Sequence, residues 1–170
     1  MNKVDRIIKE QKHKNFFTFF ILTIISLVVA IFQVIAISFL KHNMGKSVFI
    51  GILVIVVLSN ILILFTAFSY FPIFKERSNL SHQKLLKVNF GLIISLMVFA
   101  VIFVILIFLL NGINQSLTKA FEEKNMQEIT KNISFFNKIK IIKLILDSIL
   151  ILNIISLLSI NIFIKNKGGI

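Results

Sequence analysis

Four long apolar runs constrain the fold of this chain more than any other feature. They occupy residues 16–40, 48–71, 88–110 and 141–164. Each exceeds the roughly 20 residues that a helix needs to cross a ~30 Å hydrocarbon core. Lipid offers no partner to backbone N–H and C=O groups, so a run that crosses it by itself satisfies them only as a helix. We therefore predict an all-α integral membrane protein, a single domain over residues 1–170 with four transmembrane helices in a bundle.

The composition agrees with a membrane location and excludes several kinds of catalytic and metal-binding site. Hydrophobic residues make up 57% of the chain, above the roughly 45–50% that is usual in soluble domains. The chain has no cysteine, which excludes disulfides, thiolate nucleophiles and thiolate metal ligands. Its histidines, His13, His42 and His82, lie outside the apolar runs and lack a second histidine at helical spacing. We expect no metal, no cofactor and no catalytic residues, and hence no enzyme, because no nucleophile and base occur together.

Basic residues beside the apolar runs predict the orientation of the chain. With the N-terminus inside, the inner segments carry eleven Lys and Arg residues and the outer segments carry seven over a similar length. The positive-inside rule then places both termini in the cytoplasm. The abundance of Ile, Lys, Asn and Phe suggests a bacterial source, and therefore a bacterial plasma membrane.

The formal net charge of +12 indicates a lipid partner and not nucleic acid. The charge lies in short segments next to apolar runs, where anionic head groups attract it. The residues expected at the head groups are Lys3, Arg6, Lys9, Lys12, Lys14, Lys75, Arg77, Lys84 and Lys87.

Two segments outside the runs have amphipathic patterns. Residues 1–15 are basic with a short apolar face, which predicts a small helix on the inner head groups. Residues 111–140 form the longest segment expected outside the membrane. Within it Met126, Ile129 and Phe136 share one helical face with Ile133. We expect this outer segment to form a helix that lies along the interface or covers the bundle.

The fourth run carries the only acidic residue found in any run, Asp147, with Lys143 four residues before it. Lys140, Lys143 and Asn161 project within about 40° of Asp147 on a helix. One interpretation is a titratable site that carries a proton or a cation. The other is a structural ion pair in which Lys143 reaches outward to the interface. Asp147 lies only roughly 9 Å inside its run, near one face, which favours the structural interpretation.

A second polar stripe, made by Ser148, Ser156 and Ser159 with Asn153 at its edge, lies on the other side of the same run. Small polar residues at this spacing usually bring membrane helices together. Gln33 and Asn60 lie deep in the first two runs and are candidate partners. The candidate intramembrane polar site therefore comprises Lys143, Asp147, Asn153, Gln33 and Asn60.

Two functions remain open on the sequence alone. The first is a non-catalytic membrane protein, either an accessory or assembly subunit or an immunity protein against a membrane-acting toxin, whose partner is another membrane protein or further copies of itself. The alternative is a small oligomeric transporter or ion conductor that uses Asp147.

Overall fold

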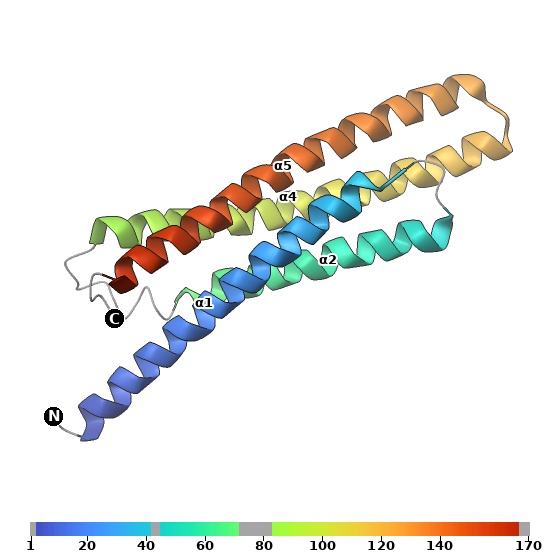
Figure 1. Ribbon diagram of the computed structural model, residues 1–170. Helices are drawn as coiled ribbons and strands as arrows, with labels where there is room; N and C mark the ends of the chain where they lie inside the picture. The colour runs from blue at the N-terminus through green and yellow to red at the C-terminus, as the bar shows by residue number, and fades with distance from the viewer. Residues whose placement is uncertain (1–2, 42–44, 72–82, 167–170) are drawn as a thin grey trace.

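The computed structural model describes residues 3–41, 45–71 and 83–166, with side chains at 14–41, 45–71 and 87–163. Over these residues the chain is all-helical, with α1 (Lys3–Ser38), α2 (Lys46–Ser69), α4 (Gln83–Glu122) and α5 (Met126–Asn166). Each of the four is long and apolar enough to cross a membrane. The helices alternate in direction, so the start of α1 and the end of α5 lie at one end of the molecule (Figure 1).

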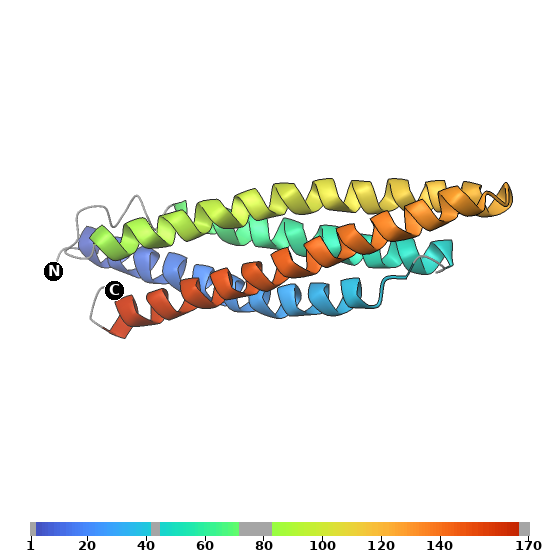
Figure 2. The same ribbon diagram turned by 90° about the horizontal axis from the view of Figure 1, so that it is seen from above.

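The four helices lie side by side along most of their length (Figure 2). Contacts join α1 to α2, α2 to α4, α4 to α5 and α5 back to α1. Each described helix therefore has two neighbours, and the four enclose a common interior.

Buried side chains recur at alternating intervals of three and four residues, the 3.5-residue repeat by which helices pack along a continuous seam. Polar residues take several of these positions, which differs from the core of a soluble protein. On α1 the repeat comprises Phe16, Phe19, Thr23, Ser26, Ala30, Gln33, Ile37 and Leu40, and on α5 its buried members include Ile129, Phe136, Lys143, Asp147, Leu150, Ile154, Leu157 and Asn161.

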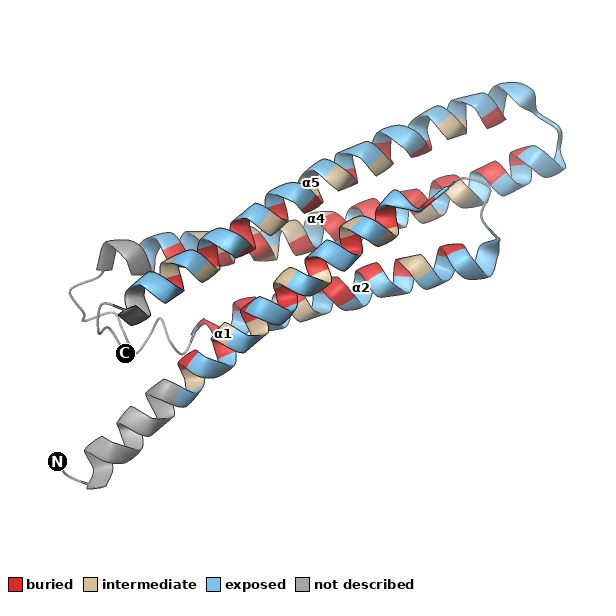
Figure 3. Cartoon of the chain, in the orientation of Figure 1, coloured by how far each residue is buried: buried red, intermediate tan, exposed pale blue. Residues whose placement is uncertain are grey.

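The outward faces of the same helices are exposed (Figure 3) and carry many large apolar side chains. Large side chains such as Phe32, Phe65, Phe108 and Leu152 are at least 60% exposed. A soluble monomer rarely exposes apolar surface on this scale, whereas lipid tails cover it at no cost. This surface and the four long apolar helices indicate a multi-pass membrane protein.

The turn between α4 and α5 is built by local hydrogen bonds. Lys124 has a positive φ of 55°, and the N–H groups of Lys124 and Asn125 donate to the carbonyl oxygens of Phe121 and Ala120, the Schellman pattern that ends a helix. Asn125 then begins α5: its Oδ1 accepts from the Glu128 N–H at 3.2 Å, and its Nδ2 donates to the Glu128 carboxylate at 3.3 Å. These two motifs reverse the chain within three residues.

This turn makes residues 111–140 a helical hairpin, which differs from the helix along the outer interface that the sequence predicted. Gly112 does not break α4, since a single glycine in a helix costs only about 1 kcal/mol. The interior repeat continues past it and holds the two arms together. Its buried residues in the hairpin include Ile113, Leu117, Ala120, Ile129, Phe136 and Ile139.

The predicted boundaries of the four membrane helices fall inside the observed helices or within two residues of their ends, but α1, α4 and α5 are longer. The segment at residues 1–15, predicted as a separate small helix, is continuous with α1 from Lys3 onward. The side chains that would define its amphipathic face, residues 1–13, lie outside those that the structure describes.

Candidate functional site

The interior between α1, α4 and α5 contains a buried ion pair. Lys143 and Asp147 lie one turn apart on α5, are 0% and 1% exposed, and their Nζ and Oδ1 atoms are in direct contact. The same Asp147 oxygen accepts a hydrogen bond from Gln33 Nε2 of α1 at 3.2 Å. On the other side, Lys143 Nζ lies 3.8 Å from the ring centroid of Phe103 of α4. The pair thus links three helices.

Asn60 of α2 belongs to the same level of the interior. Ser26 and Thr66, whose hydroxyl oxygens are 2.6 Å apart, fix how α1 and α2 are aligned. Gln33 is seven residues after Ser26 and Asn60 is six residues before Thr66. Because the two helices are antiparallel, both steps lead about 9–10 Å toward the same end. We call Gln33, Asn60, Lys143 and Asp147 the polar layer.

The polar layer lies near the middle of α2. Asn60 is fourteen residues from Lys46 and nine from Ser69, which corresponds to about 21 Å and about 13 Å along the helix. On α1 the layer lies closer to a helix end, since Gln33 is five residues before Ser38.

Several polar atoms of the layer have no hydrogen-bond partner among the described residues. They are Gln33 Oε1, Asp147 Oδ2 and both side-chain polar atoms of Asn60. A buried polar atom without a partner costs roughly 1–3 kcal/mol. Three helices therefore present unused acceptors, and one of them an unused amide donor, at one depth of the interior.

The Lys140 side chain reaches the end of α1. Its Nζ donates to the carbonyl oxygens of Ser38 and Leu40, each at 2.7 Å. These carbonyls lie at the end of α1, where the last carbonyl oxygens lack an intrahelical partner and the helix dipole favours a cation. Lys143 instead turns inward, because Asp147 and the Phe103 ring compensate its charge. The part of the structural interpretation in which Lys143 reaches outward is therefore wrong, since its side chain is 0% exposed.

Amide pairs join α4 to α5 toward the end where the chain terminates. Asn89 Nδ2 donates to Asn161 Oδ1 at 3.1 Å, and Asn161 Nδ2 donates to the carbonyl of Leu157. Asn153 Nδ2 contacts Ser95 Oγ. Asn153 was predicted as part of the polar site, but its contacts are with α4 and it is six residues from Asp147, so it lies outside the polar layer.

The serine stripe of the fourth run faces outward. Ser148, Ser156 and Ser159 are exposed, and each hydroxyl donates to the carbonyl four residues earlier on α5. They do not bring the described helices together, and Gln33 and Asn60 are not their partners. Lys14 and Lys87, two of the side chains predicted at lipid head groups, are exposed. The others lie outside the described side chains: Lys3, Arg6, Lys9, Lys12, Lys75, Arg77 and Lys84.

Sequence reasoning missed Phe103, Asn89 and the Ser26–Thr66 pair. The signal that finds them is the 3.5-residue repeat within each helix, since Thr23, Ser26 and Gln33 occupy it on α1 just as Asn89 and Phe103 do on α4. An angular comparison around a single helix does not show which side faces the other helices.

The polar layer offers charge compensation, hydrogen bonds and an unused carboxylate oxygen. Among the described residues no group of three or more His, Cys, Asp or Glu side chains is placed to hold a metal ion. Comparisons with protein-family models, with curated proteins and with solved structures found no match to this chain.

Proposed function

We propose that this chain is a non-catalytic membrane protein that acts by contact with another membrane protein. In this proposal its four helices form a transmembrane bundle in a bacterial plasma membrane, with both termini in the cytoplasm and basic residues on anionic head groups. Its role is that of an accessory or assembly subunit, or of an immunity protein against a membrane-acting toxin.

The observation that carries the proposal is that the buried acid is already bonded. Asp147 contacts Lys143 and Gln33 at once, so its charge is compensated within the protein. A buried pair on α5 with a hydrogen bond to α1 fixes which helix faces meet, a role that buried ionic groups have in some proteins. The same holds for the amide pair Asn89–Asn161, which also bonds one helix to another. In this proposal the interior holds the protein together, and contact with a partner takes place on the surface.

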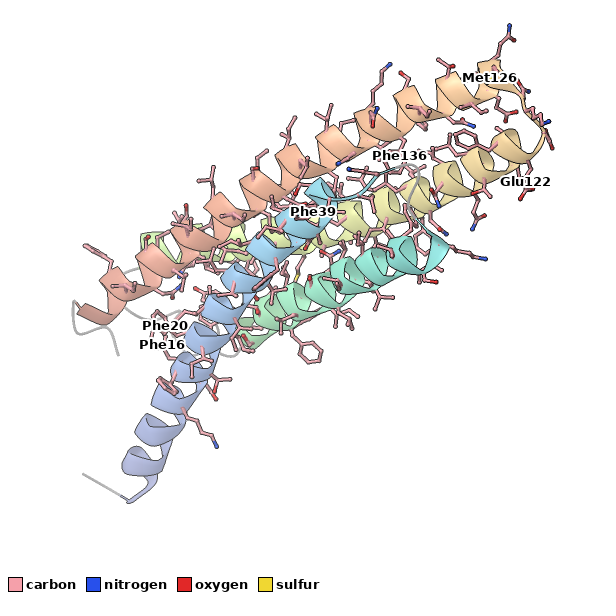
Figure 4. All side chains as sticks on the ribbon, turned by 45° about the vertical axis from the view of Figure 1, so that its right-hand side comes forward. Phe16, Phe20, Phe39, Glu122, Met126 and Phe136 are labelled. Carbon is pink, nitrogen blue, oxygen red and sulfur yellow. The ribbon has the colours of Figure 1, made fainter. Side chains whose placement is uncertain are left out.

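The hairpin at residues 111–140 is the surface that we assign to the partner. Lys140 marks the level at which α1 ends, and α5 begins fourteen residues earlier at Met126, so the hairpin extends about 20 Å past α1. Glu122 and Met126 lie at its tip (Figure 4). Met126 is 73% exposed, and Phe121 and Phe135 are each more than 40% exposed. Apolar side chains on a projecting polar segment are typical of a contact site.

Site-specific photo-crosslinking tests the proposal. A photoreactive residue is placed at Met126 and, as a matched control, at Val101, which is 60% exposed in the middle of α4. In native membranes Met126 is expected to give a discrete protein adduct and Val101 only lipid adducts. If Met126 gives no protein adduct in cells that express the whole native operon, the proposal is wrong.

Deletion of the gene separates the two roles. An accessory subunit predicts that the crosslinked partner fails to assemble or is degraded in the deletion strain. An immunity protein predicts that cells grow normally until the partner toxin is present and then lose viability.

A second candidate function is transport around Asp147, and the unused atoms of the polar layer favour it. Asp147 Oδ2 and Gln33 Oε1 are acceptors without a partner, and acceptors at one level of a membrane interior are how proton and cation pathways are built. Asp147→Asn in reconstituted vesicles decides the matter, with Glu128→Gln on the exposed hairpin as the control. If proton or cation flux is unchanged in folded Asp147→Asn, transport through this residue is excluded.

A further inference from the structure

A groove of about 770 Å³ lies between the start of α2 and the last third of the membrane-crossing helix α4. Its size falls in the range of small-molecule sites. It lies at the hairpin end of the molecule, opposite to the basic segments that the sequence assigned to lipid head groups. The polar layer does not use it. The α4 wall of the groove belongs to the hairpin at residues 111–140, but Met126, the exposed residue assigned to the partner contact, is not among its lining residues.

The groove has one apolar wall and one polar wall. On α2 the walls are Phe49, Ile50 and Leu53, with Lys46 at the helix start. On α4 the wall is polar, and it includes Asn114, Gln115 and Thr118. Because α2 and α4 are antiparallel, the apolar wall of α2 lies on the membrane side of Lys46. The outer part of the α4 wall lies toward the hairpin tip.

The part of the groove at the start of α2 and the end of α4 carries net positive charge. Lys46 and Lys119 line it from opposite walls, and Glu122 is the one carboxylate among its lining residues. Two ammonium groups with nearby amide and hydroxyl donors suit a phosphate group. The single carboxylate opposes an anion there but does not cancel both cations.

The geometry points to a binding site for one anionic diacyl phospholipid in this groove. Its phosphate lies between Lys46 and Lys119, and one acyl chain lies against Ile50 and Leu53. Ile50 is 45% exposed, so the apolar wall continues into the lipid-facing surface and the chain leaves the groove into the hydrocarbon. Binding of a soluble anion would not require this apolar wall. Binding of a protein segment would not require a groove that opens toward lipid.

Lipid retention by the purified full-length protein tests this inference. The protein in mild detergent is mixed with equal amounts of dioleoyl phosphatidylglycerol and dioleoyl phosphatidylcholine, and bound lipid is counted by native mass spectrometry. The wild type is expected to retain phosphatidylglycerol over phosphatidylcholine. Each lysine near a head group changes affinity by about 5-fold, so Lys46→Gln with Lys119→Gln lowers phosphatidylglycerol retention roughly 30-fold.

Matched variants keep the result specific to the groove. Lys131→Gln with Lys138→Gln removes the same charge from exposed positions of α5 outside the groove, and retention should stay at the wild-type level. Lys46→Arg with Lys119→Arg keeps the charge and should also retain the lipid, which separates loss of charge from loss of fold.

Three outcomes would overturn the site. In the first, the variant that lacks both groove lysines retains phosphatidylglycerol like the wild type. In the second, the control on α5 loses as much lipid as the groove variant. In the third, glycerophosphoglycerol, the head group without acyl chains, displaces the lipid at equal concentration, which would indicate a site for soluble anions. None of these outcomes bears on the partner contact at Met126, which is tested separately.

Discussion

Breaking the buried ion pair from one side should cost more stability than removing both partners. Lys143→Met leaves Asp147 buried without its cation, and Asp147→Leu leaves Lys143 buried without its anion. Loss of one partner of a buried pair costs about 3–5 kcal/mol. Part of this is returned by contacts that remain: the Gln33 amide on Asp147, or the Phe103 ring below Lys143, each about 1–2 kcal/mol. We expect each single variant to lose about 2–3 kcal/mol.

The double variant Lys143→Met with Asp147→Leu should be within about 1 kcal/mol of the wild type or more stable. Two apolar side chains of similar volume leave no buried charge to compensate, and such replacements are often neutral or stabilising. The loss on breaking the pair and the recovery on removing it together measure the coupling between the two residues.

Reversible unfolding in mixed micelles with increasing dodecyl sulfate, followed by far-ultraviolet circular dichroism, gives the four free energies of this cycle. Lys131→Met, at an exposed position of α5, controls for the general effect of losing one positive charge. The reasoning fails if the double variant loses as much stability as the sum of the two single variants. That result would mean that the two side chains do not depend on each other.

Three further predictions concern the helix ends. Lys124→Gly should raise the free energy of unfolding by about 0.5–1 kcal/mol, because glycine adopts the positive φ of 55° without the penalty of a side chain; a lower unfolding midpoint in the same dodecyl sulfate titration would argue against it. Asn125→Ala should lower the free energy of unfolding by about 1 kcal/mol through loss of the cap on α5. Asn125→Asp, which keeps an acceptor, should retain most of the stability. Lys140→Met should speed hydrogen exchange in the last turn of α1, whose carbonyls Lys140 holds, while exchange in α2 stays unchanged; equal acceleration in both helices would contradict a local role.

The sequence was sufficient to predict four long apolar helices, because the length and polarity of a membrane-crossing run leave the backbone no alternative. It also placed Lys143, Asp147 and Asn161 on one helical face, and the structure buries all three. These predictions depend only on composition and on helical geometry within a single segment.

The hairpin was missed for a different reason. A polar segment between two apolar runs was taken as a separate element, although the apolar repeat runs through it without interruption from Ile113 to Leu117 and from Ile129 to Phe136. The capping pattern Asn125 to Glu128, with an amide three residues before a glutamate, marks the start of α5 in the sequence itself.

The role of Lys143 could not be predicted because it depends on contacts between helices. Nothing in the sequence near Lys143 shows that Gln33, over one hundred residues earlier, and Phe103 meet it in space. Pairing of Ser26 with Thr66 sets the depth of Asn60 in the same way. Contacts of this kind follow from how the helices are aligned, which local patterns do not specify.

The shared 3.5-residue repeat has a consequence for tolerance to insertion. One alanine added to α5 between Phe136 and Lys143 would rotate everything that follows by about 100°, turning both members of the ion pair toward hydrocarbon while the hairpin stayed in place. An insertion of seven residues would turn the ion pair back toward the interior, but it would move both charges about 10 Å along the axis of α5, past Gln33. The buried ion pair depends on the rotation of α5 about its axis. We therefore expect the chain to tolerate many substitutions on its exposed apolar surface but almost no change in the length of α5.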